Sequence, residues 1–183
     1  HDVLKHRSRE ITAACPLGRI GRPEDVAGAV IYLAYRAGLG LLRWIPERLS
    51  LAIMANMTAQ LALDEALRYA REREAFGKPL TGFQVTRHKL AELATLVEIS
   101  REYTYRVAAR LDAGIDQIKE VSMAKNFACS VSNRVTYEAV QIFGGFGFMR
   151  GYLVERLYRD NRVLSIGGGT TEIMNEIISK LIL

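Results

Sequence analysis

Three glycine-containing segments of the sequence carry residue types that can bind phosphates and carbonyl oxygens. The first, residues 73–84, joins an arginine to an aromatic residue and a tight Gly-Lys turn. It also fits an ordinary helix C-terminus, where a cation is favourable in any protein. The second, residues 141–147, places glycines after an apolar pattern, where they either let backbone amides approach a phosphate or end a helix. Each of these two signals is weak alone.

The third segment, residues 167–172, reads Gly-Gly-Gly-Thr-Thr-Glu and follows an Arg-Asp pair at 159–160. Thr170 or Thr171 can cap a following helix, and a helix N-terminus attracts anions. A capped turn explains the threonines and Glu172, but it hardly explains three successive glycines.

Long amphipathic patterns predict the helices that hold these segments. We expect helices over residues 46–76, 81–111, 116–143, 153–158 and 171–182. The inner face of the first contains five apolar residues and, in its middle, two polar ones: Leu49, Ile53, Leu63, Leu67 and Ala70, with Asn56 and Gln60. Asp64 and Arg68 are expected to pair on the surface. Strand signals are almost absent, so the fold class is all-α: an antiparallel four-helix bundle with a short N-terminal helical appendage.

Composition narrows the functional classes. The chain has 183 residues, a net charge of +5 and a pI near 9.4, but its basic residues alternate with acidic ones, so nucleic acid is not required. Cys15 and Cys129 lie far apart, and the three histidines are scattered. We therefore expect no disulfide framework and no metal site, and a reducing cytoplasm as the default location. No stretch is apolar and long enough to cross a membrane.

Residues 16–34 carry a different signature, Pro-Leu-Gly-Arg-Ile-Gly-Arg-Pro-Glu-Asp-Val-Ala followed by Ile-Tyr-Leu-Ala. This piece, within about residues 10–35, resembles the late segment of short-chain dehydrogenases/reductases. That family's glycine-rich nucleotide loop and Tyr-xxx-Lys pair are absent, which counts against a nicotinamide-dependent reductase. We interpret residues 1–36 as a fragment or appendage, residues 37–43 as a linker, and residues 44–183 as the helical bundle.

The order and spacing of the three glycine segments together are specific. From about residue 44 to the end, the chain resembles the C-terminal helical domain of the acyl-CoA dehydrogenase family. The resemblance implies a bundle that makes dimer or tetramer contacts and lies against FAD. It assigns three groups of residues to the cofactor: Arg73, Phe76 and Gln84 toward the FAD of a neighbouring subunit, Gln141, Gly144 and Gly145 toward the adenosine diphosphate half of that FAD, and Thr170 and Glu172 toward the FAD bound in cis.

Most members of this family carry a catalytic glutamate where this chain has Gly168. A subset, similar to the long-chain and isovaleryl enzymes, has the base on the first long helix, and the matching residue here is Glu47. Burial beside an acyl chain would raise the pKa of Glu47 toward the range useful for a base. The alternative is a surface acid that complements the helix dipole. The resemblance also implies Arg48 and Gly169 at the substrate and the Gly168 N–H as a donor to the carbonyl oxygen.

The activity that this resemblance implies is FAD-dependent α,β-dehydrogenation of an acyl-CoA thioester. The chain would be a truncated or fused form that needs N-terminal domains absent from this sequence. The alternative is a non-catalytic helical module that forms homo-oligomers or docks onto a flavoprotein dehydrogenase.

Overall fold

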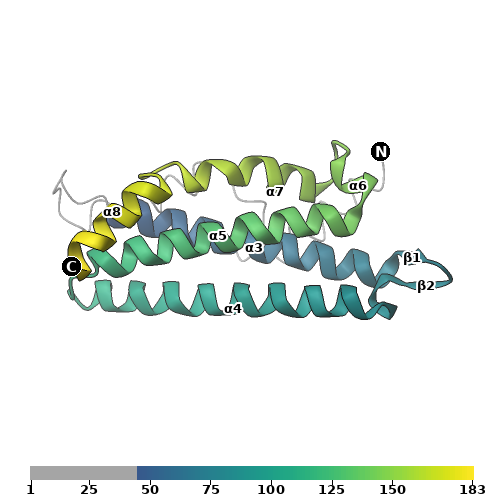
Figure 1. The fold of residues 1–183 in the computed structure, drawn as a ribbon, viewed down its shortest axis with the longest axis horizontal. Helices are drawn as coiled ribbons and strands as arrows, with labels where there is room; N and C mark the ends of the chain where they lie inside the picture. Colours follow the sequence, from purple (N-terminus) through teal and green to yellow (C-terminus); the bar gives the residue numbers. More distant parts are fainter. Residues whose placement is uncertain (1–44) are drawn as a thin grey trace, which may run out of the picture. The chain divides into compact units, whose positions relative to one another are not determined.

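The computed structural model describes residues 45–183, and Glu47–Leu183 form one compact unit. Its long helices run in alternating directions, with the last two in line as the fourth member of the bundle (Figure 1). They are α3 (Ile45–Glu72), α4 (Gln84–Asp112), α5 (Ile118–Phe143), α7 (Leu153–Asn161) and α8 (Thr171–Ile182). Short helical pieces at η1 (Leu80–Gly82), α6 (Gly145–Phe148) and η2 (Arg162–Ser165) connect them. The predicted antiparallel four-helix bundle is confirmed; the appendage and the linker lie outside the described residues.

A row of buried alanines on α3 lets the neighbouring helices approach closely. Six of them have no exposed surface: Ala52, Ala55, Ala59, Ala62, Ala66 and Ala70. Leucines and valines from α4 and α5, among them Leu93 and Val135, pack against the row in one apolar cluster. The predicted burial of Leu49, Leu63 and Ala70 is confirmed, but that of Ile53 is wrong, because Ala52 and Ala55 take the inward positions and leave Ile53 37% exposed.

The predicted polar middle of the α3 face is confirmed at Asn56. Its side chain is buried and donates to Thr104 Oγ1 at 2.8 Å, while Ser100 Oγ donates to Asn56 Oδ1 at 2.5 Å. The expected pair of Asp64 with Arg68 is wrong. Arg68 instead binds glutamates at 65 and 72, one helical turn to either side.

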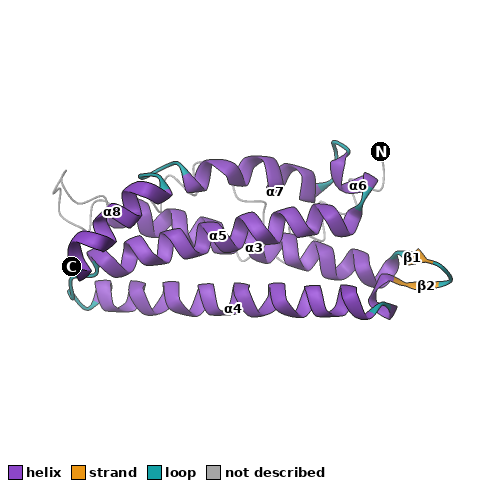
Figure 2. Ribbon diagram, in the orientation of Figure 1, coloured by secondary structure: helices purple, strands orange, loops and turns teal. Residues whose placement is uncertain are grey.

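A short β-hairpin, which the sequence did not predict, ends α3 (Figure 2). Strand β1 (Glu74–Ala75) pairs antiparallel with β2 (Lys78–Pro79). The two residues between them, Phe76 and Gly77, have φ of 51° and 77°. Positive φ at both positions is the requirement of a type I′ hairpin turn, which reverses the chain within two residues.

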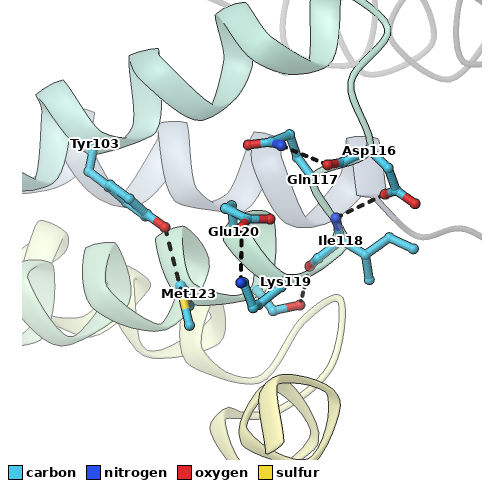
Figure 3. Close-up of polar contacts among 8 residues, drawn as sticks. Tyr103, Asp116, Gln117, Ile118, Lys119, Glu120 and Met123 are labelled. Carbon is cyan, nitrogen blue, oxygen red and sulfur yellow. Dashed lines mark hydrogen bonds and ion pairs between the residues drawn. The ribbon is translucent and has the colours of Figure 1, made fainter. Parts of the chain in front are cut away.

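Paired hydrogen bonds also fix the turn from α4 to α5. The Gly114 N–H donates to Leu111 O at 3.0 Å and the next amide donates to Arg110 O at 3.1 Å, which is the Schellman arrangement that terminates helices. Asp116 Oδ1 then accepts from the Ile118 N–H at 3.2 Å and so starts α5 (Figure 3). The N-terminal end of α5 is therefore anchored at its first residue.

Candidate active site

The first turn of α3 and the glycine-rich turn before α8 meet at one end of the bundle, although 120 residues separate them in the chain. Arg48 Nε donates to Gly168 O at 3.1 Å. A Cβ built on Gly168 would lie 3.6 Å from Glu47 Oε1. The structure therefore brings Glu47 to the position from which a side chain at residue 168 would start.

The conformation of the turn requires glycine. Gly168 and Gly169 have φ of 63° and 108°, in the region that residues with a side chain rarely adopt. A Cβ on Gly168 would lie 2.7 Å from Leu51 Cδ1, and one on Gly169 would lie 2.7 Å from Met174 Cε. Among the described residues, no backbone carbonyl accepts a hydrogen bond from the Gly168 N–H. That amide is consequently available to a ligand.

Two cations hold the carbonyl groups of this turn. Arg48 binds Gly168 O, and Lys125 Nζ, from α5, donates to Gly169 O at 2.6 Å. Lys125 is only 1% exposed, and burial lowers its pKa; the neighbouring Arg48 adds to this shift and Glu47 opposes it. Burial also lowers the pKa of Arg48, and Glu47 opposes this shift.

Other side chains of α5 continue this row of contacts. Cys129 Sγ donates to Leu164 O at 3.2 Å, and Asn133 Nδ2 donates to Ser165 Oγ at 3.0 Å. Asn126 Nδ2 donates to Thr171 O at 3.3 Å. Burial raises the pKa of the Cys129 thiol, so it stays protonated and able to donate. Sequence reasoning missed Lys125, although a lysine one helical turn after Val121, on the apolar stripe of α5, was a detectable signal.

The start of α8 differs from a simple capped turn. Thr170 is the N-cap residue, but its side chain makes no capping hydrogen bond to the helix backbone. The neighbouring Thr170 side chain, followed by the backbone N–H of Glu172 itself, lowers the pKa of the Glu172 carboxyl. Glu172 is fully exposed in this domain.

The remaining predicted cofactor residues gather at the opposite end of the bundle. Arg73 follows α3, and its guanidinium lies 5.9 Å from the centre of the Phe146 ring. A cleft of about 430 Å³ opens there, between Arg73 and the turn at Gly144 and Gly145. At its base the rings of Tyr69 and Phe143 stack 4.0 Å apart.

Three more predicted residues border this end, and all three are exposed. Phe76, in the hairpin turn, is 97% exposed and meets Phe83 edge-on. Gln84 is the first residue of α4, with its amide 3.4 Å from His88 Nε2, and Gln141 lies in the last turn of α5. Since α3 has 28 residues, it is about 42 Å long, and the two groups lie near its opposite ends.

These features define the class: a helical bundle with a cation-clamped, glycine-rich turn opposite a carboxylate at one end and an arginine-glycine cleft at the other. The model of the acyl-CoA dehydrogenase C-terminal domain matches residues 44–183, so the chain belongs to this family. It begins after the segment that resembles short-chain reductases, and so gives that resemblance, which lies outside the described residues, no support.

Individual relatives agree with the family. The chain is 43% identical over 136 residues to an acyl-CoA dehydrogenase of Bacillus subtilis, covering 74% of this chain and 36% of the relative. It is 38% identical over 148 residues to the mouse mitochondrial long-chain specific acyl-CoA dehydrogenase, covering 78% and 33%. The crystal structure of a probable acyl-CoA dehydrogenase from Mycobacterium abscessus matches with a TM-score of 0.76 and 55% identity, over 77% of this chain and 38% of that one. The chain thus spans about a third of the length of such relatives.

Within residues 45–183, no helix combines the length and the hydropathy that a membrane span requires.

Proposed function

We propose that this chain is the C-terminal part of an FAD-dependent enzyme that dehydrogenates acyl-CoA thioesters between the α and β carbons. The observation that carries the proposal is the meeting of Glu47 with Gly168. Where the family commonly places a catalytic glutamate this chain has glycine, and a carboxylate from another helix reaches within 3.6 Å of the missing side chain's first atom. Membership of the family supports the reaction class.

In this proposal Glu47 removes the α proton of the thioester. The electrons left behind accumulate on the thioester carbonyl oxygen, which therefore needs a hydrogen-bond donor. The Gly168 N–H is available for this, because no backbone carbonyl of the described residues accepts from it. Arg48 and Gly169 border the same space, and Arg48 fixes the turn through Gly168 O. Loss of one such carbonyl donor typically costs about 10²–10³ in rate.

The residues at the far end fit part of FAD. An arginine, a glycine turn with open space at Gly144 and Gly145, and stacked rings offer charge, backbone amides and apolar surface in one cleft. Arg73, Phe76, Gln84 and Gln141 would hold the cofactor there, and Thr170 and Glu172 would contact a cofactor at the Glu47 end. When bound, FAD accepts the hydride from the β carbon.

The distance between the two groups supports a homo-oligomer. They lie near opposite ends of a helix about 42 Å long, farther apart than one dinucleotide reaches. In a dimer or tetramer, the arginine cleft of one subunit would face the cofactor of its neighbour. We propose this assembly together with the domain division into residues 1–36, 37–43 and 44–183. We also propose a cytoplasmic location, which is supported by the wide separation of the two cysteines in the sequence.

Flavin content and the Glu47→Gln variant test the proposal. Co-expressed with the N-terminal domains of an acyl-CoA dehydrogenase, the chain should show a flavin spectrum and reduce a dye when given an acyl-CoA. Glu47→Gln should lower the rate of α-proton release into solvent by about 10²–10⁴, since it removes the general base, and should leave the flavin spectrum unchanged. Glu102→Gln, an exposed glutamate on α4, is the matched control and should leave the rate unaltered. Unchanged turnover in Glu47→Gln would remove the assignment of the base.

The second candidate function is a non-catalytic module that oligomerises or docks onto a flavoprotein dehydrogenase. The exposure of Phe76 and Arg73 favours it, because both side chains remain accessible to a partner although Phe83 and Phe146 lie beside them. A helical oligomer that stays colourless with the N-terminal domains present, measured by light scattering and absorbance, would support this module and exclude the enzyme.

A further inference from the structure

The glycine-rich turn is held mainly by side chains of other helices. The amides of Ile166 and Gly167 both donate to Val163 O, at 3.0 and 2.8 Å, but none of the described backbone carbonyls accepts from Gly168 or Gly169. At Gly168 and Gly169 the fixed points are therefore the two carbonyl groups that Arg48 and Lys125 bind, and the next carbonyl, that of Thr170, accepts from the Met174 N–H at 3.0 Å.

Lys125 is an unusual residue to find in this place. It is the largest side chain among the almost fully buried residues of the domain. Within residues 45–183, no carboxylate lies within 4.0 Å of its ammonium group, and its one hydrogen bond in that range is to Gly169 O. Burial of a cation opposes folding unless strong polar contacts offset it, and an apolar side chain of similar volume is often at least as stable.

We propose that Lys125 is a positioning residue, which the fold retains to order the glycine-rich turn and not to stabilise the bundle. Its ammonium group holds the Gly169 carbonyl from the α5 side while Arg48 holds the Gly168 carbonyl from the α3 side. Held at both carbonyls, the turn keeps the Gly168 N–H beside Glu47. Ordering the turn and stabilising the bundle can be distinguished by removing the cation. The turn then loses a charge-assisted hydrogen bond, whereas the core loses only a buried charge, which opposes folding.

The bond to Gly169 O also has an electronic consequence. The Gly169 carbonyl and the Thr170 N–H belong to the same peptide group, so a cation on the oxygen polarises that N–H into a stronger donor. Lys125 thus acts on the turn and on the first residue of α8 together.

Amide hydrogen exchange of the 183-residue chain tests this inference without measuring turnover. The inference rests on the proposed function only in assigning a catalytic purpose to the ordered turn. In Lys125→Met, the hydrogen-bonded amides that flank the turn, those of Ile166, Gly167 and Met174, should exchange on the order of tenfold faster, the factor expected for loss of one charge-assisted bond. The melting temperature should be equal to or above that of the unmodified chain. Lys125→Gln retains an N–H donor and should restore part of the protection.

Lys89→Met is the matched control. Lys89 also extends from a helix of the bundle and pairs with Glu138, but away from the turn. The Lys89→Met variant should leave the exchange of the three amides unchanged.

A Lys125→Met chain that melts well below the unmodified chain, or fails to fold, would overturn the inference by giving Lys125 a stabilising role. A folded variant with unaltered exchange at the three amides would overturn it as well. In an enzyme that joins the chain to N-terminal domains of the family, kcat should fall in Lys125→Met with a smaller change in KM. Absence of any activity in that enzyme would count against the proposed function and leave the exchange result decisive for Lys125.

Discussion

Replacing Gly168 with alanine should destabilise the domain by roughly 2–3 kcal/mol. The φ of 63° costs a residue with a Cβ about 1–2 kcal/mol. The new Cβ would lie 2.7 Å from Leu51 Cδ1, so the leucine must move, at a further cost of about 1–3 kcal/mol. Alanine also restricts the unfolded chain, which offsets about 0.4–1 kcal/mol. Urea unfolding followed by far-UV circular dichroism measures the difference.

Two further variants separate the two costs. Gly114 has a similar φ, 77°, but a Cβ there would meet nothing within 4 Å, so Gly114→Ala should show the backbone cost alone. In a Leu51→Ala background, Gly168→Ala should become about 1 kcal/mol less costly, because the clash is gone. The reasoning is refuted if Gly168→Ala costs no more than Gly114→Ala, or costs the same with and without Leu51. If it holds, Leu51 in its present conformation and a side chain at residue 168 exclude each other, which explains physically why the carboxylate comes from α3.

Asn56→Ala should lower the free energy of unfolding by about 1–3 kcal/mol in the same assay, because it leaves the buried hydroxyls of Ser100 and Thr104 with one partner fewer; a loss below about 0.5 kcal/mol would contradict this. The pKa of Glu172, measured by carboxyl NMR titration, should lie below that of an ordinary glutamate and rise in Thr170→Val. Since its native pKa is the lower one, any stability it contributes is present above the unfolded pKa and is lost as the pH falls through the native value. An unshifted pKa of Glu172, or a Thr170→Val variant without effect on it, would contradict the influence of Thr170 on this carboxyl.

Most of the fold could be predicted from the helical spacing of apolar residues and from the glycines that end helices. The last helix has the predicted bounds, and α5 ends at Phe143 because Gly144 adopts a φ of 59° that stops a helix. The hairpin after α3 escaped prediction because two-residue strands leave no alternating pattern. The exposure of Ile53 was also hidden, because alanine is too weakly apolar to reveal which face of α3 is buried.

Some residues of the candidate site could also be predicted from the sequence, and others could not. The proximity of Glu47 and Gly168 could be predicted only from the family resemblance, since no local pattern relates residues so far apart in the chain. Lys125 was overlooked because a lysine in a helix is usually a surface residue, and only the packing of α5 against the glycine turn shows its burial. Their catalytic and cofactor roles stay predictions.

The unbroken length of α3 has a consequence for the insertions that the domain can accept. A helix advances 1.5 Å and turns 100° for each residue, so one residue added between its ends would rotate Glu47 by about 100° relative to Arg73. No loop within α3 can absorb that rotation, as the helix runs without interruption from Ile45 to Glu72. The number of residues in α3 therefore fixes the orientation of Glu47 relative to Arg73. Insertions in the turn around Gly114 leave that orientation unchanged.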